Sequence, residues 1–291
     1  MKLAVSSYSF WKYIKEGKMT QLDVIAKAAE MGFAGVDYID LEPVENPTLQ
    51  QQIDYAKEIR REAEKYGIVI VAYTVGAKLY NGSAEADAKE VERLRGQIDV
   101  AEALGARILR HDVCKSEMVG DRFVGFDRML PVMAENARRV TEYAKSKGIR
   151  TCSENHGFVA QDSDRVERLY YAVDHENFGL LLDIGNFACV DENSAHAVSR
   201  LAPCAIHVHA KDFYVRPFDY IPKEGEETFR SRGCNLLSGC TIGDGDIPVA
   251  QCITILKRAK YDGFLTIEYE GSEDCLVGIA RGRDYLNSYL N

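Results

Sequence analysis

Strand-like apolar segments alternate with helical segments eight times along the chain, and few folds are compatible with such an alternation. Glycine residues mark the repeat, because five of them stand just before a strand-like segment, at Gly32, Gly67, Gly105, Gly148 and Gly263. No proline- or serine-rich linker divides the units. The pattern therefore predicts one closed (β/α)8 TIM barrel that spans residues 1–291 as a single domain.

The segments that this fold requires can be located in the sequence. The expected strands are residues 3–9, 35–39, 68–75, 107–113, 149–156, 178–183, 205–209 and 264–270. The expected helices are residues 20–31, 49–66, 84–104, 126–147, 164–173, 194–201, 249–260 and 276–290. A doubly wound open sheet is the alternative, but the Gly-x-Gly-x-x-Gly turn of its dinucleotide-binding versions is missing after the first strand.

A long segment follows the seventh expected strand. Residues 213–248 are polar and contain five glycines, at Gly225, Gly233, Gly239, Gly243 and Gly245. Because long connections in compact domains often carry function, we interpret this segment as a lid or a binding loop. Asp246 is expected to cap the helix that follows.

Composition and charge exclude several classes of protein. The chain has 291 residues, 46% of them hydrophobic, and a formal net charge of −9. An acidic chain repels phosphate backbones, so nucleic acid is not expected as a partner. No run of about 18 apolar residues indicates a membrane span. The first residues become polar too early for a signal peptide, and the eight cysteines contain no Cys-x-x-Cys pair, so we expect a cytoplasmic protein with reduced thiols.

Four expected strands in the second half of the chain carry a metal-binding residue at or near their end. These residues are Glu154, Asp183, His209 and Glu268, on the fifth to eighth strands. Because the C-terminal ends of the strands meet at one face of such a barrel, the four side chains are expected to share one site. Three carboxylates and one imidazole suit one divalent ion, which we expect to be Mn²⁺, with Mg²⁺, Co²⁺ and Zn²⁺ as alternatives.

Five motifs follow one another in this region. They are Ser153-Glu-Asn-His-Gly157, Leu182-Asp-Ile-Gly-Asn186, His207-Val-His-Ala-Lys-Asp212, Gly243-Asp-Gly-Asp-Ile247 and Ile267-Glu-Tyr-Glu-Gly271. In this order they resemble the sugar phosphate isomerase/epimerase family, the xylose-isomerase-like TIM barrels, and the resemblance extends over nearly the whole chain. It implies a single-metal site with the same four ligands, in which the metal histidine is His209 and not His207.

The resemblance also implies a chemistry. It indicates a metal-dependent enzyme that isomerises or epimerises a ketose or a related polyol ketone through an enediolate, with a small sugar as substrate. Glu154 and Glu268 are expected to remove and return the proton, and His156 is a further candidate for acid or base catalysis. Coordination by a metal ion would keep both glutamates ionised.

Two other hypotheses stay open. Ketose 3-epimerases of the family usually have a histidine three positions after the strand-six aspartate, where this chain has Asn186. This difference favours a metal-dependent lyase or dehydratase acting on a keto sugar or inosose, including C-glycoside deglycosidase-type chemistry. A non-catalytic sugar-binding subunit is the third hypothesis, against which the intact ligand set argues. The six histidines are too few for the trinuclear zinc site of the related endonuclease IV.

Four residues are expected to contact the substrate: His111, Asn186, Lys211 and Trp11. Three of them also have a structural interpretation, since His111 could cap the next segment, Lys211 could pair with Asp212, and Trp11 could simply pack. His207 is interpreted as a residue of the barrel interior. The sequence sets no oligomeric state, and a homo-oligomer is compatible with it.

Overall fold

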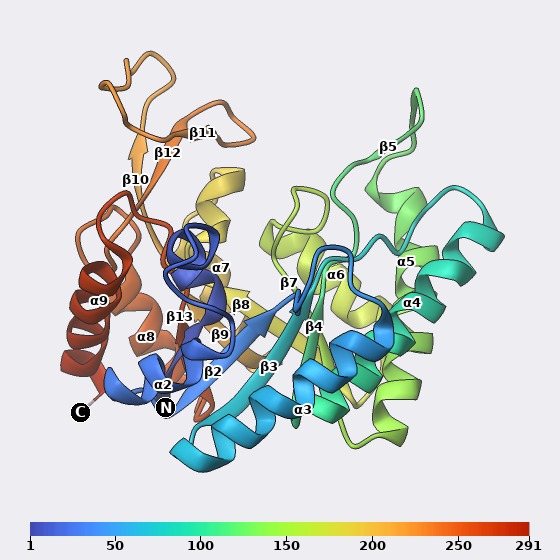
Figure 1. Ribbon diagram of the computed structural model, residues 1–291. Coiled ribbons are helices and arrows are strands. Elements are labelled where there is room, and N and C mark those ends of the chain that lie inside the picture. Colours follow the sequence, from blue (N-terminus) through green and yellow to red (C-terminus); the bar gives the residue numbers. More distant parts are fainter. Residues whose placement is uncertain (291) are drawn as a thin grey trace.

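Eight parallel strands form a closed barrel in the computed structural model, which describes residues 1–290 (Figure 1). The last strand pairs with the first, with Lys2 opposite Phe264, so the sheet has no free edge. The predicted (β/α)8 barrel is confirmed, and the doubly wound alternative is wrong. The strands are β1 (Lys2–Ser6), β2 (Gly35–Ile39), β3 (Val69–Val75), β4 (Ile108–His111), β7 (Arg150–Glu154), β8 (Phe178–Asp183), β9 (Ala205–Ala210) and β13 (Phe264–Ile267).

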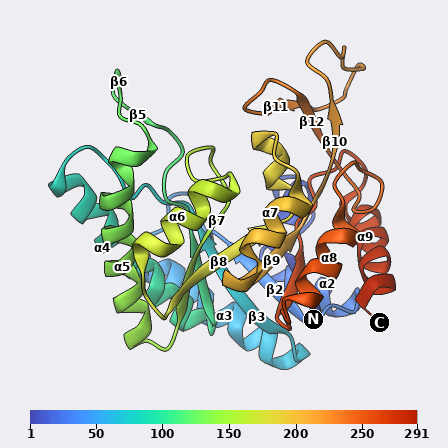
Figure 2. The same cartoon turned by 180° about the vertical axis from the view of Figure 1, so that it is seen from behind.

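Helices surround the barrel on all sides, as Figures 1 and 2 show together. The two chain ends lie near each other at the bottom of Figure 1. Among residues 1–290, no helix combines the length and the apolar character that crossing a membrane requires. The helices are α2 (Asp23–Glu30), α3 (Leu49–Tyr66), α4 (Ala84–Leu104), α5 (Phe126–Ser146), α6 (Ser163–Val173), α7 (Ser194–Leu201), α8 (Val249–Arg258) and α9 (Cys275–Leu290).

Local sequence explains where the best-predicted helices begin and end. Thr48 and Gln51 form a reciprocal capping box at the start of α3, and Ser83 accepts the N–H of Ala86 at the start of α4. Both helices end at a glycine in the left-handed region, Gly67 with φ 69° and Gly105 with φ 78°. A glycine at that position costs no strain, which is why the predicted bounds of both helices are confirmed.

Side chains of the strands divide into an inner and an outer layer. Ala72, Ile108, Cys152 and Leu181 form an interior cluster that is separate from the large core between strands and helices. Because strand residues alternate in direction, Arg110, Glu154 and Asp183 continue the inward-facing rows toward the C-terminal end of the barrel. The barrel interior is therefore apolar in the middle on the side of β3, β4, β7 and β8, and charged at this end.

Three details differ from the sequence-based expectation. The first strand ends at Ser6, because Ser6 accepts the N–H of Tyr8 and the chain turns into the 3₁₀ helix η1 (Ser7–Phe10) and the short helix α1 (Trp11–Lys15). The eighth strand ends at Ile267, so Glu268 lies just beyond it. Asp246 does not cap α8; its carboxylate instead accepts the N–H of Val215 at 2.8 Å.

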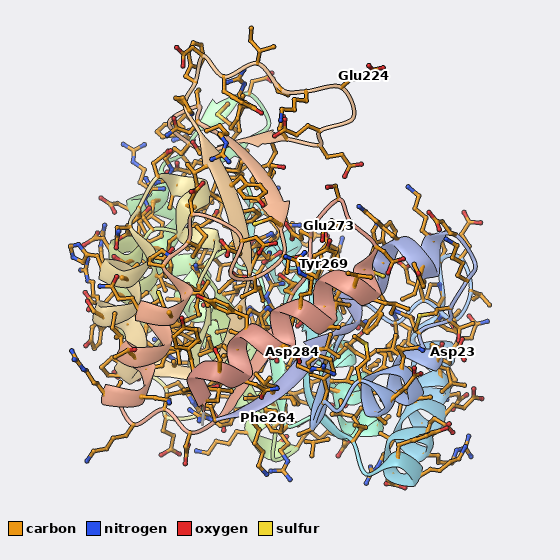
Figure 3. All side chains as sticks on the ribbon, turned by 90° about the vertical axis from the view of Figure 1, so that its left-hand side faces the viewer. Asp23, Glu224, Phe264, Tyr269, Glu273 and Asp284 are labelled. Atoms are coloured by element: carbon orange, nitrogen blue, oxygen red, sulfur yellow. The ribbon has the colours of Figure 1, made fainter. Side chains whose placement is uncertain are left out.

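The long segment after β9 has secondary structure of its own and is not a plain loop. It forms a three-stranded antiparallel sheet of β10 (Asp212–Arg216), β11 (Phe229–Arg230) and β12 (Leu236–Cys240). We call residues 212–240 the excursion. Figure 3 shows Glu224 at its outer end, with Glu273 and Tyr269 below it. A smaller hairpin of β5 (Met118–Val119) and β6 (Arg122–Phe123) stands on the other side of the same barrel end in Figure 1.

Hydrogen bonds connect the turn between β11 and β12 of the excursion to the loops after β7 and β8. Asp191 accepts from the Ser231 hydroxyl at 2.6 Å and from the Asn235 amide at 2.8 Å. Arg232 pairs with Asp162 at 2.9 Å. The excursion therefore contacts the barrel at two places, at its own base and across the neighbouring loops.

Candidate metal centre

The four ligands expected from the sequence lie together at the C-terminal end of the barrel. Glu154, Asp183, His209 and Glu268 each offer one ligand atom, and these atoms all lie within 4.8 Å of one another. All four residues are nearly inaccessible to solvent. A buried concentration of three carboxylates is unfavourable unless cationic partners or a metal ion neutralise it.

The spacing of this cluster fits an ion. Ligand bonds of about 2.0–2.2 Å place neighbouring ligand atoms of one ion about 2.8–3.6 Å apart. His209 Nδ1 and Glu268 Oε1 are 3.6 Å apart. His209 Nδ1 and Asp183 Oδ2 are also buried without a hydrogen-bond partner among the described residues. These two atoms are ready to act as ligands, so the donor set fits the expected divalent metal.

A second group of ligand-type atoms lies deeper in the barrel, at Asp37, His207 and His209. Asp37 Oδ2 is 2.5 Å from His207 Nε2 and 3.0 Å from His209 Nε2. The shorter distance is that of a hydrogen bond and is too short for two ligands of one ion. This group is therefore a hydrogen-bonded network and not a second metal centre.

Asp37 orients the candidate metal histidine. Because Nε2 of His209 faces the Asp37 carboxylate, Nδ1 faces the cluster, as in carboxylate–histidine–metal arrangements. Burial opposes the charge on Asp37, but His207 and His209 hold the pKa of its carboxyl below the usual range. Sequence reasoning missed Asp37, whose only signal is an acidic residue in the middle of an apolar strand. The expectation that His207 lies in the barrel interior agrees with its complete burial.

Two side chains hold Glu154. The guanidinium of Arg110 lies 2.5 Å from Oε2, and the side-chain amide of Asn186 donates to Oε1 at 2.8 Å. Arg110 is itself buried and also pairs with Asp112 at 2.8 Å. Sequence reasoning predicted a site role for Asn186 but gave none to Arg110.

Lys211 neutralises the opposite side of the cluster. Its ammonium lies 2.7 Å from Glu268 Oε2, 2.9 Å from Glu270 Oε1 and 3.4 Å from Asp183 Oδ2. Burial opposes the charge on Glu268, but Lys211 and His209 hold the pKa of its carboxyl well below the usual range. The alternative pairing of Lys211 with Asp212 is absent from the ion pairs of residues 1–290, because Asp212 accepts backbone N–H groups instead.

Of the three carboxylates in the cluster, Asp183 is the one whose negative charge is least neutralised by nearby cations. One oxygen accepts the N–H groups of Gly185 and Asn186 at 2.8 and 2.9 Å, which leaves Oδ2 for the cluster. Burial raises the pKa of its carboxyl to about 6, against the opposing charge of Lys211. Gly185 is needed beside it, because a Cβ there would lie 3.0 Å from the carbonyl oxygen of Lys211. The chain can thus pass close to Lys211 just after the ligand.

His156 and Asp112 form a hydrogen-bonded pair at the rim. Nδ1 of His156 lies 2.8 Å from Asp112 Oδ1, and the imidazole side chain is 39% exposed. Burial opposes the charge on Asp112, but Arg110 and His156 hold the pKa of its carboxyl below the usual range. An oriented, partly exposed imidazole can exchange protons with a bound molecule. Arg110 connects this pair to Glu154.

The two remaining candidates do not join the cluster. His111 is completely buried and faces the outer layer, where its ring lies 6.3 Å from that of Phe178 and Nδ1 contacts the carbonyl oxygen of Asp112. The structure therefore gives no support to substrate contact by His111. Trp11 is 50% exposed on α1 and lines cavities at the edge of the barrel mouth.

Comparisons with known proteins agree with the fold. The family model described as xylose isomerase-like TIM barrel matches residues 25–289. The rhizopine catabolism protein MocC of Rhizobium meliloti is 25% identical over 265 residues, which cover 84% of this chain and 73% of that protein. The residues that the family model matches, 25–289, contain the whole candidate cluster.

Solved structures share the fold at low identity. The IOLI protein with a bound zinc atom covers 100% of this chain and 98% of its own, with a TM-score of 0.75 and 13% identity. The probable 3-DHS dehydratase AsbF of Bacillus anthracis covers 99% of both chains, with a TM-score of 0.74 and 15% identity. A D-psicose 3-epimerase solved with D-fructose covers 99% of this chain and 98% of its own, with a TM-score of 0.72 and 15% identity.

Proposed function

The chain belongs to the xylose isomerase-like TIM barrel family, and we propose that it isomerises or epimerises a ketose or a related polyol ketone through an enediolate intermediate. The observation that carries the proposal is the buried convergence of Glu154, Asp183, His209 and Glu268. A proton next to a carbonyl group is too weakly acidic for an unaided carboxylate. These residues would hold one divalent ion, Mn²⁺ or one of Mg²⁺, Co²⁺ and Zn²⁺, which as a Lewis acid stabilises the negative charge that develops on the substrate.

Glu154 and Glu268 are suited to carry the proton. They come from β7 and from the end of β13, with β8 and β9 between them, so they reach the same space from different sides. Arg110 and Asn186 hold Glu154, and Lys211 holds Glu268, so both side chains have fixed positions beside the cluster. One glutamate would remove the proton and the other would return it.

Solvent exchange tests this proposal directly. The protein is incubated with Mn²⁺ and a panel of ketoses and polyol ketones in D₂O, and the sugars are followed by NMR. Deuterium should enter at the carbon next to the carbonyl group of at least one sugar, together with formation of its isomer or epimer. Absence of deuterium from every member of the panel, in a protein shown to bind the metal, would count against enolisation altogether.

A lyase or dehydratase is the second candidate, and a specific contact favours it. The pairing of His156 with Asp112 provides a proton donor at the rim, which a leaving hydroxyl or aglycone needs. Asn186 also stands where related 3-epimerases have a histidine. Incubation with 3-keto sugars or inososes distinguishes the two reactions, because elimination gives an ultraviolet-absorbing enone and isomerisation does not.

The other site assignments belong to the same proposal. Asn186 and Lys211 lie beside the cluster and would contact substrate oxygens, and Trp11 would form an apolar wall at the mouth. The excursion would act as a lid, and its anchors Asp191 and Arg232 support a position over the neighbouring loops. A cytoplasmic location and a homo-oligomer remain compatible with this role.

A further inference from the structure

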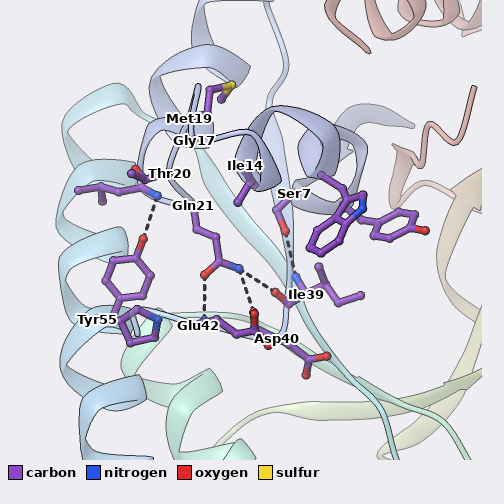
Figure 4. A pocket seen from close by; sticks show the side chains of 14 residues that line it. Ser7, Ile14, Gly17, Met19, Thr20, Gln21, Ile39, Asp40, Glu42 and Tyr55 are labelled. Atoms are coloured by element: carbon purple, nitrogen blue, oxygen red, sulfur yellow. Dashed lines mark hydrogen bonds between the residues drawn. The ribbon is translucent and has the colours of Figure 1, made fainter. Parts of the chain in front are cut away.

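A cavity of about 830 Å³ lies at the C-terminal ends of β1 and β2, at the same end of the barrel as the metal cluster (Figure 4). Residues of η1 and α1 line it on one side, and the loop that follows β2 lines it on the other. None of the four candidate ligands lines it. Sites for drug-sized ligands occupy about 300–1,000 Å³, so this cavity offers room for a substantial chemical group beside the sugar site.

Hydrogen bonds fix one wall of the cavity to the strand that leads to Glu268. The hydroxyl of Ser9 donates to the carbonyl oxygen of Ile267 at 3.0 Å and accepts the N–H of Tyr269 at 2.9 Å. Its neighbour Tyr8 lines the cavity. Tyr8 and Trp11 also line a second cavity, whose lining includes Glu270. Glu270 contacts Lys211 at 2.9 Å, so Tyr8 links the first cavity to the side of the cluster that Lys211 neutralises.

The walls are mainly apolar. Ile14, Met19, Leu22 and Ile39 contribute aliphatic side chains, and the half-exposed ring of Trp11 stands beside them. Burying such surface against an apolar ligand is favourable, because both surfaces leave water.

The neutral polar groups of the lining are largely engaged within the protein. The amide of Gln21 donates to the carbonyl oxygens of Ile39 and Asp40 and accepts the N–H of Glu42, as Figure 4 shows. The hydroxyl of Tyr55 accepts the N–H of Leu22 at 3.1 Å. These groups shape the cavity and leave little capacity to bind the hydroxyl groups of a second sugar.

The charge of the lining is acidic. Asp40 and Glu42 line the cavity, and no lysine, arginine or histidine does so. A phosphate group would meet two carboxylates and no cation, which disfavours its binding. The cavity thus selects against the anionic end of a sugar phosphate.

We propose that this cavity binds an uncharged apolar group attached to the sugar, so that the substrates are glycosides that carry a keto group, or similarly substituted polyol ketones, and not sugar phosphates. The inference rests on the proposed function, because the sugar part has to lie at the metal cluster for its substituent to reach the cavity. Tyr8 and Trp11 lie at the junction of the two parts. The apolar group contributes affinity and orientation and takes no part in proton transfer.

Pairs of glycosides that differ only in the attached group test the proposal. Phenyl and methyl β-glycosides of glucose, galactose, mannose and xylose are titrated into the Mn²⁺-loaded protein by calorimetry. At least one phenyl glycoside should bind about 10–100-fold more tightly than its methyl partner, because only the phenyl ring removes apolar surface from water. The emission of Trp11, the single tryptophan of the chain, should change with the phenyl compound. Sugar 6-phosphates should gain no affinity over the free sugars.

A filling variant locates the effect. Ile14→Trp places a larger side chain in the cavity and should remove the phenyl advantage while leaving the affinity for the methyl glycoside unchanged. Val44→Trp is the matched control, since Val44 is exposed and lies outside the cavity lining, next to the lining residue Pro43. It should retain the advantage.

Equal affinity within every pair, or no binding of any phenyl glycoside, overturns the proposal. So does a phenyl advantage that survives in Ile14→Trp, because the ring would then bind elsewhere. These results are independent of the test of function: deuterium exchange into free ketoses without a phenyl advantage removes only the cavity assignment, and a phenyl advantage without exchange removes only the proposed reaction.

Discussion

The two halves of the barrel contribute to the candidate site in different ways. β7, β8, β9 and β13 carry the four side chains that form the cluster, whereas β2 and β4 carry the side chains that hold them. Asp37 on β2 contacts His209 on β9, and Arg110 on β4 contacts Glu154 on β7. The second half thus supplies the reactive groups and, through Asn186 and Lys211, part of their support. The first half adds the carboxylate that orients His209 and the cation beside Glu154.

This division shows that the candidate site also requires residues that orient the ligands and neutralise their charge. A histidine free to rotate and a carboxylate without a cation would be poor ligands, because orientation and ionisation both have to be fixed before a metal arrives. Supporting residues should therefore affect metal affinity and stability, and reactive residues should affect turnover. The predictions that follow test this difference, from the largest expected effect to the smallest.

Glu154→Gln and Glu268→Gln should have the largest effect. Each keeps the shape of the side chain but removes a base, so kcat should fall by about 10²–10⁴ or more in each variant. Glu270→Gln is the control, because Glu270 contacts Lys211 but stands outside the four-residue cluster, and it should cost far less. If Glu270→Gln abolished metal binding and Glu268→Gln did not, the ligand at the end of β13 would have been assigned wrongly.

Arg110→Met should mainly lower stability. It leaves the carboxylates of Asp112 and Glu154 buried without the cation between them, and breaking a buried ion pair typically costs about 3–5 kcal/mol. Urea unfolding of the metal-free protein measures the change in the free energy of unfolding. Arg107→Met, at an exposed position just before β4, is the control and should change it little. Equal stability of the two variants would show that Arg110 is not needed to neutralise this side of the barrel.

Asp37→Ala should weaken metal binding without removing a ligand. Loss of such an orienting carboxylate typically costs about 10–100-fold in metal affinity, which calorimetry with Mn²⁺ or Co²⁺ measures. Asp37→Asn should have a smaller effect, because its amide oxygen can still accept from His209. Thr74→Ala is the control on the neighbouring strand, since its hydroxyl is also buried but has no hydrogen-bond partner among the described residues. An equal loss in Asp37→Ala and Thr74→Ala would contradict the orienting role.

The pH dependence of metal affinity should change slope near pH 6. Burial opposes a proton on His209, but Glu268 and Asp37 raise the pKa of its imidazole, so metal binding has to displace this proton at neutral pH. Asp183, whose pKa is raised to about 6, adds a second proton below that pH. As the pH decreases, the apparent affinity should fall about tenfold per pH unit down to pH 6 and more steeply below pH 6. Proton release that stays constant between pH 5 and pH 8 would contradict this assignment.

Most of the fold and the four residues of the cluster could be predicted from the sequence. Repeated alternation, capping residues such as Thr48 and stop signals such as Gly67 act within a few residues of chain, so the bounds of α3 and α4 and the barrel itself could be predicted. The four members of the cluster could also be identified, because each stands at or just beyond the end of its own strand and parallel strands bring those ends together.

The sequence was less informative where contacts cross the barrel. Asp37 and His209 are separated by 172 positions, and no local pattern relates them. Local signals also misled at Asp246, whose carboxylate binds the excursion instead of capping α8, and at His111, which the alternation of β4 turns into the outer layer. The three-stranded sheet of the excursion was not predicted either. It depends on pairing of β10 and β11 with β12, which no local pattern in the sequence indicates.

The sequence by itself determined the barrel and the chemical types of the side chains gathered at its mouth. The tertiary structure decided which atom of His209 faces the cluster, which cation neutralises each carboxylate, and where an apolar cavity opens beside them. The physical reason is that periodicity and capping depend on neighbours along the chain, whereas tautomers, ion pairs and cavities depend on neighbours in space, which closure of the barrel alone brings together.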